Sequence, residues 1–515
     1  MLQKHYYTEP TDLDRIVFDK LIPEDHYLRQ VKALIDFSFV REIVQDAYSP
    51  TMGRPAEDPV TMFKLEFLQF HYNLSDREVL KHAQVNVAFR FFLDLSLESK
   101  LPSHGLLSQF RSRLGLERYQ ALFDEIVAQA RSHGLVKDRL RLKDATHVIA
   151  NIAVPSTLAL IAQIRKRLLD SAAPYGPERA TAEQAKAIEI RQVTVDLSDR
   201  ERLLHRVEHL RRIVHWADGI KAHLGAVEAD DTRRLRFEQV LALAHKVLSD
   251  QQAQGDKLRS VVDPDARRGK HGAFFDGYLL DVMLDPESEL ITALEVLPGN
   301  GAEAADAPVL IEAEEAAHGN TVEALSIDGV GWQGPVLRTL SQDLSVEVYV
   351  PPPVEPTSTG FFRAEDFTLD ETETVLSCPG GAQTTKRYRN DKDTAWRYEF
   401  KRSQCQGCPL LARCMEQLPA HYGRRLTKND YQAEYDAARA RAQTPAYAAV
   451  RRVHPRIERK LAEIVRYHGG RRCRSRGRWR VRIEYLLRGI VVNVKRMVRL
   501  LAGLVERPVV GIAVR

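Results

Sequence analysis

Three acidic residues occupy positions from which regular structure could bring them to one site. Asp144 follows the strand-like run RLRLK, Asp328 ends the strand-like run VEALSI, and Glu458 lies in the helical run HPRIERKLAEIVRYHGG. Carboxylates are natural ligands of hard divalent cations, and metal-dependent phosphodiester chemistry needs two such ions roughly 4 Å apart. An aspartate at a strand end is also common without any catalytic role. The three residues together predict a site for two Mg²⁺ or Mn²⁺ ions.

A second glutamate on the same helical run competes with Glu458 for this role. Apolar residues at three- and four-residue spacing define the buried stripe of the helix, and Glu458 lies at the edge of that stripe. Glu463 instead shares a face with Arg459 and Arg466, where pairing within the helix gives it an ordinary surface role. Helix phase therefore favours Glu458.

Four of the five cysteines lie close together in the sequence. They follow the pattern C-x26-C-x2-C-x5-C, with glycine and proline nearby in SCPGG and QCQGCP. Four thiolates can close a tetrahedral structural zinc site, which would stabilise a small insertion without a core of its own; unligated thiols are the alternative. The four residues are Cys378, Cys405, Cys408 and Cys414.

Positive charge is concentrated in one segment. From Arg451 to Arg499 the chain holds 17 basic and three acidic residues, a local charge of +14, whereas its net charge is +5. A solvated helical face usually interleaves both signs, so this excess favours a polyanionic partner such as DNA. Arginine suits phosphate, and the cluster would place DNA beside the metals. We expect DNA contacts from Arg471, Arg472, Arg474, Arg476, Arg478, Lys495 and Arg496.

The composition is that of a soluble globular protein, with 44% hydrophobic and 28% charged residues. No apolar run reaches the roughly 20 residues of a membrane span, and the first residues lack the apolar stretch of a signal peptide. We therefore expect a cytoplasmic protein.

The pattern divides the chain into six regions. The first is helical and ends in a basic helix with Arg111 and Arg113, which fits a helix-turn-helix-like DNA reader and a plain helical bundle equally well. We expect a helical N-terminal DNA-binding domain over 1–135, a first catalytic strand region over 136–156, a helical insertion over 157–258, core strands and a helix over 259–350, a linker and Cys-rich insertion over 351–420, and the catalytic helix with a basic C-terminal region over 421–515.

The order of elements predicts the fold class. A strand precedes Asp144, and an antiparallel hairpin is expected from AFFDGYLLDVMLD and LITALEVLPGN, which turn formers separate at 286–288. A helix, a strand and a late helix follow. This order predicts an α/β domain with a sheet of mixed direction and two insertions.

Short motifs around these carboxylates resemble those of bacterial insertion-sequence DDE transposases. DATHVIANIAVPSTL, SIDGVGWQGPVL and RIERKLAEIVRYHGGRRCRSRG resemble the three acidic motifs of that family. LIPEDHYLRQVKALID, GRPAEDPVTMFKLEFLQFHYNLSDREV and LPSHGLLSQFRSRLG resemble its helical N-terminal domain. The resemblance spans nearly the whole chain, through the order and joint occurrence of the motifs.

The resemblance implies a ribonuclease H-like catalytic domain and a metal-binding triad of Asp144, Asp328 and Glu458. It implies cleavage at transposon ends, and then attack of the freed 3′-OH on target DNA at the same site. The implied partners are terminal inverted repeats, target DNA and a second copy of the chain on DNA. A non-catalytic DNA-binding protein derived from a transposase is the alternative.

Two positions depart from the family pattern. Many relatives carry a lysine one or two turns beyond the glutamate, where this chain has Val465 and then Arg466. Arg466 is the expected replacement for the phosphate contact. The second aspartate is often followed closely by Gly-Tyr, whereas Trp332 stands near that place here. Trp332 could stack on an unpaired base or pack in the core.

A glycine pattern offers a rival class. The loop from Gly329 to Gly334 reads G-x-G-x-x-G after a strand, as in dinucleotide-binding enzymes. Asp328 would bring negative charge toward a pyrophosphate, and Pro335 removes an N–H where the helix should donate one. We therefore disfavour a nicotinamide enzyme.

Overall fold

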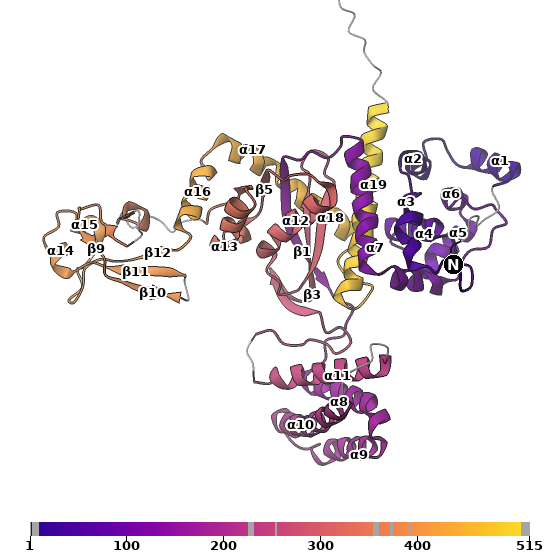
Figure 1. Cartoon of the computed structure of the whole chain (residues 1–515), viewed down its shortest axis with the longest axis horizontal. Helices are drawn as coiled ribbons and strands as arrows, with labels where there is room; N and C mark the ends of the chain where they lie inside the picture. Colours follow the sequence, from indigo (N-terminus) through magenta and orange to yellow (C-terminus); the bar gives the residue numbers. More distant parts are fainter. Residues whose placement is uncertain are drawn as a thin grey trace, which may run out of the picture.

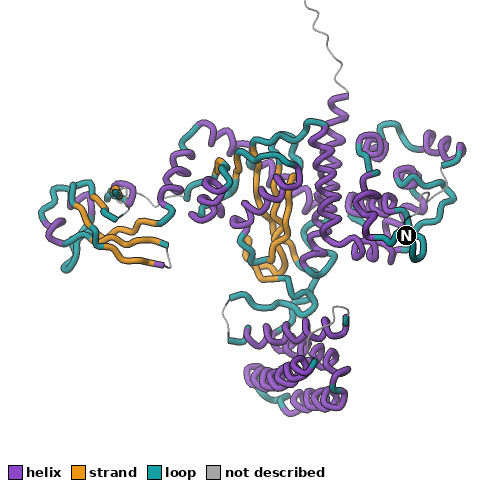
Figure 2. Tube along the Cα trace, in the orientation of Figure 1, coloured by secondary structure: helices purple, strands orange, loops and turns teal. Residues whose placement is uncertain are grey.

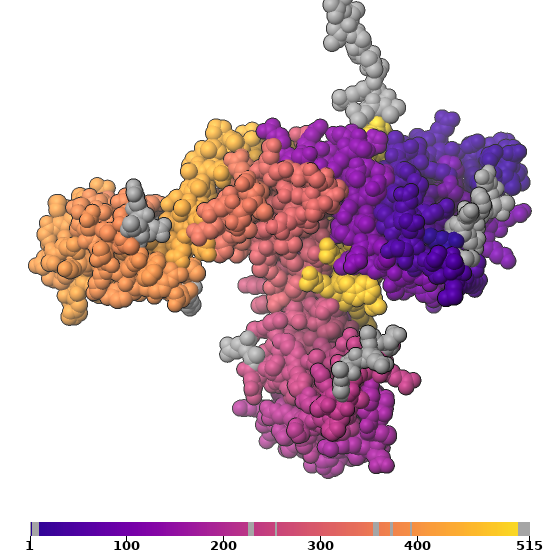
Figure 3. Space-filling view, viewed as in Figure 1, coloured from indigo at the N-terminus to yellow at the C-terminus, as the bar shows by residue number. Residues whose placement is uncertain are grey.

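The protein has a central sheet from which three lobes extend (Figure 1). N-terminal helices lie on one side of the sheet, a cysteine-bearing lobe lies on the other, and a helical bundle lies beyond one end of the strands (Figures 1 and 2). The bundle and the cysteine-bearing lobe project from the body in Figure 3. The computed structural model describes residues 2, 10–224, 231–252, 255–353, 360–370, 374–391 and 394–505.

Seven helices form the N-terminal region. Capping side chains set where several begin: the Ser75 hydroxyl accepts from the Glu78 N–H, and the Glu78 carboxylate accepts from the Ser75 N–H. The last helix bends at Gly115, whose φ of 69° suits glycine. The helices are α1 (Asp12–Leu21), α2 (Tyr27–Leu34), α3 (Phe39–Val44), α4 (Pro59–His71), α5 (Asp76–Val85), α6 (Val87–Phe92) and α7 (His104–Ser132).

The N-terminal region shares its core with the C-terminal helix α19 (Arg478–Val505). Helix α4 is apolar around most of its circumference, and all but one of its residues from Pro59 to Phe70 are buried. Helix α19 packs against α7, α4 and α2, and Figure 1 shows it alongside α7. One continuous hydrophobic cluster runs from Leu28 to Leu501 and includes residues of the central sheet.

The central sheet has six strands of mixed direction. Strand β3 pairs antiparallel with β1 on one side and with β4 and β2 on the other. Strands β1, β5 and β6 run parallel and complete the sheet. The predicted mixed α/β class is confirmed, as is the predicted hairpin. The strands are β1 (Leu140–Ile149), β2 (Arg267–His271), β3 (Ala273–Leu284), β4 (Ile291–Pro298), β5 (Ala324–Ser326) and β6 (Glu347–Tyr349).

Helices and short turns connect these strands and cover the sheet. In Figure 1 α12 and α18 lie over it. The connecting elements are the short helices η3 (Glu303–Asp306), η4 (Gly329–Gly331) and η5 (Thr339–Asp343), and the helices α12 (Ala307–His318), α13 (Gly334–Arg338), α16 (Gln432–Ala442), α17 (Pro445–Val453) and α18 (Pro455–Tyr467). The short helix η1 (Gln45–Ala47) belongs to the N-terminal region, between α3 and α4.

Two insertions interrupt the sheet. The first, between β1 and β2, is a bundle with a hydrophobic core of its own; it contains α8 (Thr157–Ala172), η2 (Ala173–Tyr175), α9 (Pro177–Val193), α10 (Asp199–His223) and α11 (Thr232–Ser249). The second follows β6 and has a small separate core. It contains η6 (Ala364–Asp366), β7 (Thr368–Leu369), β8 (Leu376–Ser377), β9 (Gln383–Thr384), β10 (Arg387–Asn390), β11 (Ala395–Glu399), α14 (Arg402–Gln406), α15 (Leu411–Cys414) and β12 (Arg425–Asn429).

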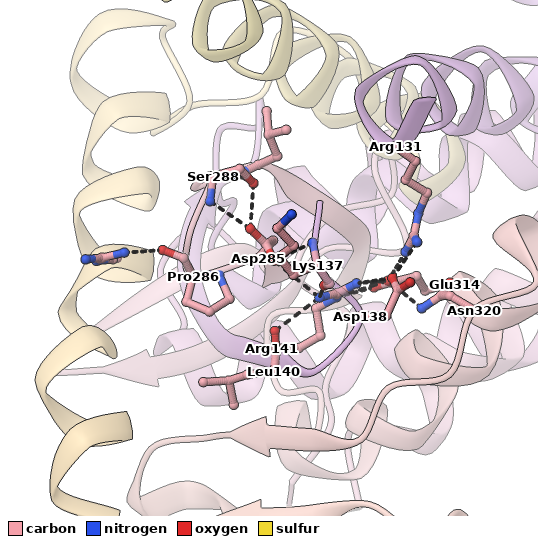
Figure 4. A network of polar contacts seen from close by, with 12 residues as sticks. Arg131, Lys137, Asp138, Leu140, Arg141, Asp285, Pro286, Ser288, Glu314 and Asn320 are labelled. Carbon is pink, nitrogen blue, oxygen red and sulfur yellow. Dashed lines mark hydrogen bonds and ion pairs between the residues drawn. The ribbon is translucent and has the colours of Figure 1, made fainter. Parts of the chain in front are cut away.

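A buried ion network fixes the start of β1 (Figure 4). Arg141 donates to the Glu314 carboxylate of α12 at 2.6 to 3.0 Å, and Arg131 of α7 donates to it at 2.9 Å. Asp285, at the β3–β4 turn, lies 3.6 Å from Arg141. Breaking a buried pair leaves an uncompensated charge, so this network holds α7, α12 and β1 in register.

None of the helices in the described part of the chain combines the length and apolar character that a bilayer crossing requires.

Candidate active site

Parallel pairing brings Asp144 and Asp328 to the same edge of the sheet. Leu142 of β1 pairs with Ser326 of β5, and each aspartate lies two residues further along its own chain. The expectation that the strand stops at Asp144 is wrong. Strand β1 continues to Ile149 because β3 pairs with it along that whole stretch, with Asp144 opposite Val282.

Each aspartate is held by a local backbone hydrogen bond. The Asp144 carboxylate accepts from the N–H of Ala145 at 2.8 Å. The Asp328 carboxylate accepts from the N–H of Val330 at 3.1 Å and caps the short turn η4. These bonds fix both side chains, Asp144 within β1 and Asp328 just after β5, without using all of their acceptor capacity.

Burial and neighbouring carboxylates raise the pKa of Asp144 to about 7. Loss of water around the charged form is the largest cause, and the charges of Asp328, Glu303 and Glu458 act in the same direction, while the Ala145 N–H opposes them. Because the charges of Asp328 and Glu458 both act on Asp144, the three predicted residues lie in one neighbourhood. A cation there would relieve both the repulsion and the poor solvation.

Glu303 is a fourth carboxylate of this neighbourhood that sequence reasoning missed. It begins the short helix η3, which contacts η4. Burial first, and then the Asp328 charge, raise its pKa, while Lys143 and His271 lower it. Lys143 also donates to the Glu303 carbonyl at 2.7 Å and to the buried Asp281 carboxylate at 2.8 Å. No local pattern marks Glu303, since it lies in an irregular turn.

Glu458 lies in the first turn of α18, which packs against β1. Its side chain is exposed, next to the buried Ile457. Two residues join this helix to the strand that leads to Asp328. His454 Nδ1 lies 2.9 Å from the Ser326 hydroxyl in a buried contact, and Arg451 donates to the Ile327 carbonyl at 3.1 Å.

Glu463 has a different role from the one its helix phase predicts. It is only 19% exposed and pairs with Lys460 at 2.9 Å and with Lys495 of α19 at 2.8 Å. Although burial opposes it, this pairing lowers the pKa of Glu463 to about 2. The predicted surface role with Arg459 and Arg466 is wrong, because α19 covers this side of the helix.

Within the described residues, no group of three or more His, Cys, Asp or Glu side chains has the arrangement of a metal site. The carboxylates at the sheet edge therefore share a neighbourhood and an electrostatic field without being closed around an ion. Their donor chemistry, oxygen ligands in a negatively charged setting, suits Mg²⁺ or Mn²⁺.

Much of the basic segment is engaged inside the protein. Arg471 donates to the His147 carbonyl at 2.5 Å. Arg474 donates to the Leu74 carbonyl at 2.5 Å, and Arg476 to the Asn151 carbonyl at 2.8 Å. Arg496 donates to the Ser288 carbonyl at 2.6 Å. These bonds tie the segment to the end of β1, the N-terminal helices and the β3–β4 turn.

Three other residues of the expected DNA-contacting set are exposed: Arg466, Arg472 and Arg478. Arg478 lies 3.7 Å from Glu295. The backbone of Arg472 forms a parallel bridge with Ile149, so its side chain is fixed near the end of β1. These three are best placed to reach a phosphate.

Two further predicted contacts lie against protein. Trp332 is half-buried and stacks on Tyr435 with ring centroids 5.4 Å apart, which favours the packing role over base stacking. In the N-terminal region Arg111 pairs with Glu66 at 3.0 Å and with Asp76 at 2.5 Å, which leaves it little freedom to reach DNA.

The four predicted cysteines lie near one another in the second insertion, although among the described residues they do not have the arrangement of a metal site. A Cβ added to Gly380 would meet the Cys408 sulfur at 3.0 Å and the Cys378 sulfur at 3.7 Å. Burial and the charges of the other three raise the pKa of the Cys414 thiol, although Arg424 lowers it. All four are free of disulfides, as is the buried Cys473.

Two family models match the chain. The Transposase domain (DUF772) matches residues 16–113, and the Transposase DDE domain matches residues 377–498, which include Glu458. No curated protein and no solved structure matches. These two regions of the chain are similar to transposase domains, and the matches support an insertion-sequence DDE transposase.

Proposed function

We propose that this transposase cleaves transposon ends and joins them to target DNA through Asp144, Asp328 and Glu458. The observation that carries the proposal is the parallel pairing of β1 with β5, which brings the two aspartates to one edge where their charges and that of Glu458 act together. The three carboxylates would hold two Mg²⁺ or Mn²⁺ ions, which activate the attacking oxygen and steady the leaving oxygen when bound.

The sheet supports a ribonuclease H-like catalytic domain. If β2 is set aside, the strands lie in the order β4, β3, β1, β5, β6, with β3 antiparallel to both of its neighbours. Numbered along the chain, this order is third, second, first, fourth and fifth. In this order the first strand, β1, lies beside the fourth, β5, so Asp144 and Asp328 come close together.

DNA would pass over this edge beside the exposed arginines of the basic segment. Arg466, Arg472 and Arg478 would contact phosphates next to the scissile bond. Arg471, Arg474, Arg476, Lys495 and Arg496 would act mainly by holding the segment in place, given their internal bonds. A homodimer on paired terminal repeats is the assembly that the family leads us to propose.

We also propose that Cys378, Cys405, Cys408 and Cys414 bind a structural Zn²⁺. The charges of the other three thiolates act on Cys414, and the Cys408 and Cys378 sulfurs lie beside Gly380; both support the proposal, since a cation would offset the negative charge.

The test of the catalytic proposal is cleavage of a labelled terminal-repeat duplex with Mg²⁺. We expect cleaved ends and joined products from the unaltered chain. With Asp144→Asn we expect a loss of at least about a hundredfold in rate, because a metal ligand is removed while its shape is kept. Binding of the duplex by both proteins serves as the control.

The alternative is a DNA-binding protein that has lost catalysis. Binding without cleavage in the unaltered chain, with Mg²⁺ and with Mn²⁺, would establish it and defeat the catalytic proposal.

A further inference from the structure

The small sheet of the second insertion has one face open to solvent. Strands β10, β11 and β12 pair antiparallel, with Tyr388 opposite Arg397 and Arg397 opposite Thr427. Paired residues of an antiparallel sheet lie on the same face, so these three form one row. Lys386 and Arg425 flank it. All five are exposed; we call Lys386, Tyr388, Arg397, Arg425 and Thr427 the open face.

The opposite face of the same sheet is closed. Tyr398 and Leu426 alternate with the open-face residues and are buried in the core of the insertion. Trp396 packs against that core, with the Arg387 guanidinium 4.2 Å from its ring centroid. The sheet is therefore anchored from behind, and its exposed residues stand on a rigid support.

Each side chain of the open face ends in a hydrogen-bond donor. Lysine, arginine, tyrosine and threonine are all common donors to phosphate oxygens. Within the described part of the chain, Arg397 has no ion-pair partner. Glu399 is the one carboxylate at the flank, and it is shared by Lys386 at 2.5 Å and Arg425 at 2.6 Å. Lys386 and Arg425 carry two positive charges against the single negative charge of Glu399, so one positive charge remains at the flank in addition to that of Arg397.

The sequence around this face is basic. Residues 383–428 hold 11 Lys and Arg and four Asp and Glu, a charge of +7. In the basic segment near the active site, many Arg and Lys side chains donate hydrogen bonds to carbonyl and carboxylate oxygens of the protein. By comparison, the open face keeps the charge of Arg397 unpaired within the described residues and one charge in excess at Glu399.

We propose that the open face binds duplex DNA through its phosphates, at a distance from the bond that is cut. The partner follows from charge complementarity and rests on the proposed function, for which DNA is the substrate. Phosphate contacts fix the position of a duplex without reading its sequence. The open face would therefore hold the same DNA at a second point and set its direction over the active site.

The experiment measures binding of fluorescein-labelled duplexes by the full-length chain, without added Mg²⁺, as a function of salt. One duplex carries a terminal repeat and another has a scrambled sequence. For the double variant Lys386→Gln/Arg397→Gln we expect about tenfold weaker binding of both duplexes. We also expect the slope of log affinity against log salt to fall by about 2, since two phosphate contacts are lost.

Matched variants separate binding from folding. Arg389→Gln removes an exposed charge on the opposite face of the same sheet, where Arg389 pairs with Asp391 and Asp430, and binding should change less than about twofold. Tyr388→Phe removes only a hydroxyl and should weaken binding without lowering the unfolding temperature.

Unchanged affinity and salt slope in the double variant would overturn the proposal, and so would an equal loss with Arg389→Gln. Failure of the proposed function is distinguishable: it appears as absent cleavage by a chain whose binding still depends on the open face.

Discussion

At the scale of single residues, the contact between Ser326 and His454 joins the two elements that carry Asp328 and Glu458. Ser326 precedes Asp328 by two residues, and His454 precedes Glu458 by four. Their 2.9 Å contact is buried. Small errors in the placement of reacting groups cost large factors in rate, so under the proposed function we expect these two to act as positioning residues for the carboxylates.

The titration of His454 gives a test of this contact. Burial first, and then Arg451, lower its pKa to about 4 from an ordinary value of 6.5. Because the folded state disfavours the proton, the stabilisation is complete above pH 6.5 and is lost as the pH falls toward 4. Urea unfolding should show a loss of about 1 to 3 kcal/mol over that window.

The control for that measurement is His454→Asn, which keeps a short polar side chain and cannot titrate. Its free energy of unfolding should fall less between pH 6.5 and 4 than that of the unaltered chain. Identical pH profiles for the two proteins would remove His454 as the cause.

The sequence located the three carboxylates by their place after strands and on a helix edge, but it could not reveal Glu303 or the Ser326–His454 contact. Ser326 and His454 are 128 residues apart, and such a pairing leaves no local pattern. Glu463 was misjudged for a related reason. Helix phase describes one helix alone, and the face of α18 that carries Glu463 is covered by α19.

At the scale of elements, Glu463 holds α18 against α19. Glu463→Gln leaves the buried Lys460 without its carboxylate and should destabilise the fold by about 1 to 3 kcal/mol. Glu458→Gln on the same helix is the matched control: its side chain is exposed, so stability should change by less than about 0.5 kcal/mol.

The same two variants should show the opposite pattern in DNA cleavage. Glu458→Gln is expected to lose cleavage while keeping its unfolding midpoint, and Glu463→Gln is expected to do the reverse at temperatures where it stays folded. A stable, fully active Glu458→Gln would exclude Glu458 from the triad.

Elements whose sequence has a clear hydrophobic periodicity could be predicted. The hairpin of β3 and β4 and helix α18 follow from alternation, turn formers and Pro455. The C-terminal boundary of β1 could not be predicted, because its last residues form a strand only through pairing with β3 and with the distant Arg472. Tertiary pairing, which propensity does not encode, determines that boundary.

At the scale of the whole molecule, the second insertion depends on few contacts. Its core has five buried residues, and three of the four cysteines pack against it. Metal analysis of the purified chain should therefore find about one Zn²⁺ per molecule, and Cys405→Ser should reduce it. With a chelator the insertion should become sensitive to protease while the central sheet stays intact.

A zinc-free preparation whose insertion resists protease as well as the untreated protein would support unligated thiols instead.

The distribution of charge over the folded molecule also differs from the distribution along the sequence. The excess of +14 between Arg451 and Arg499 predicted an exposed DNA-binding surface, but buried guanidinium groups such as that of Arg488, which donates to the His468 carbonyl at 3.0 Å, account for part of it.

The core shared by α4 and α19 bears on how the chain is made. About 400 residues separate His71 from Arg478, so the ribosome needs about 20 to 80 s to supply the second helix after the first. During that time α4 lacks its partner and keeps an apolar side uncovered. A product truncated before α19 should therefore aggregate instead of competing with the finished protein for DNA, and sedimentation of a chain ending at residue 477 checks this.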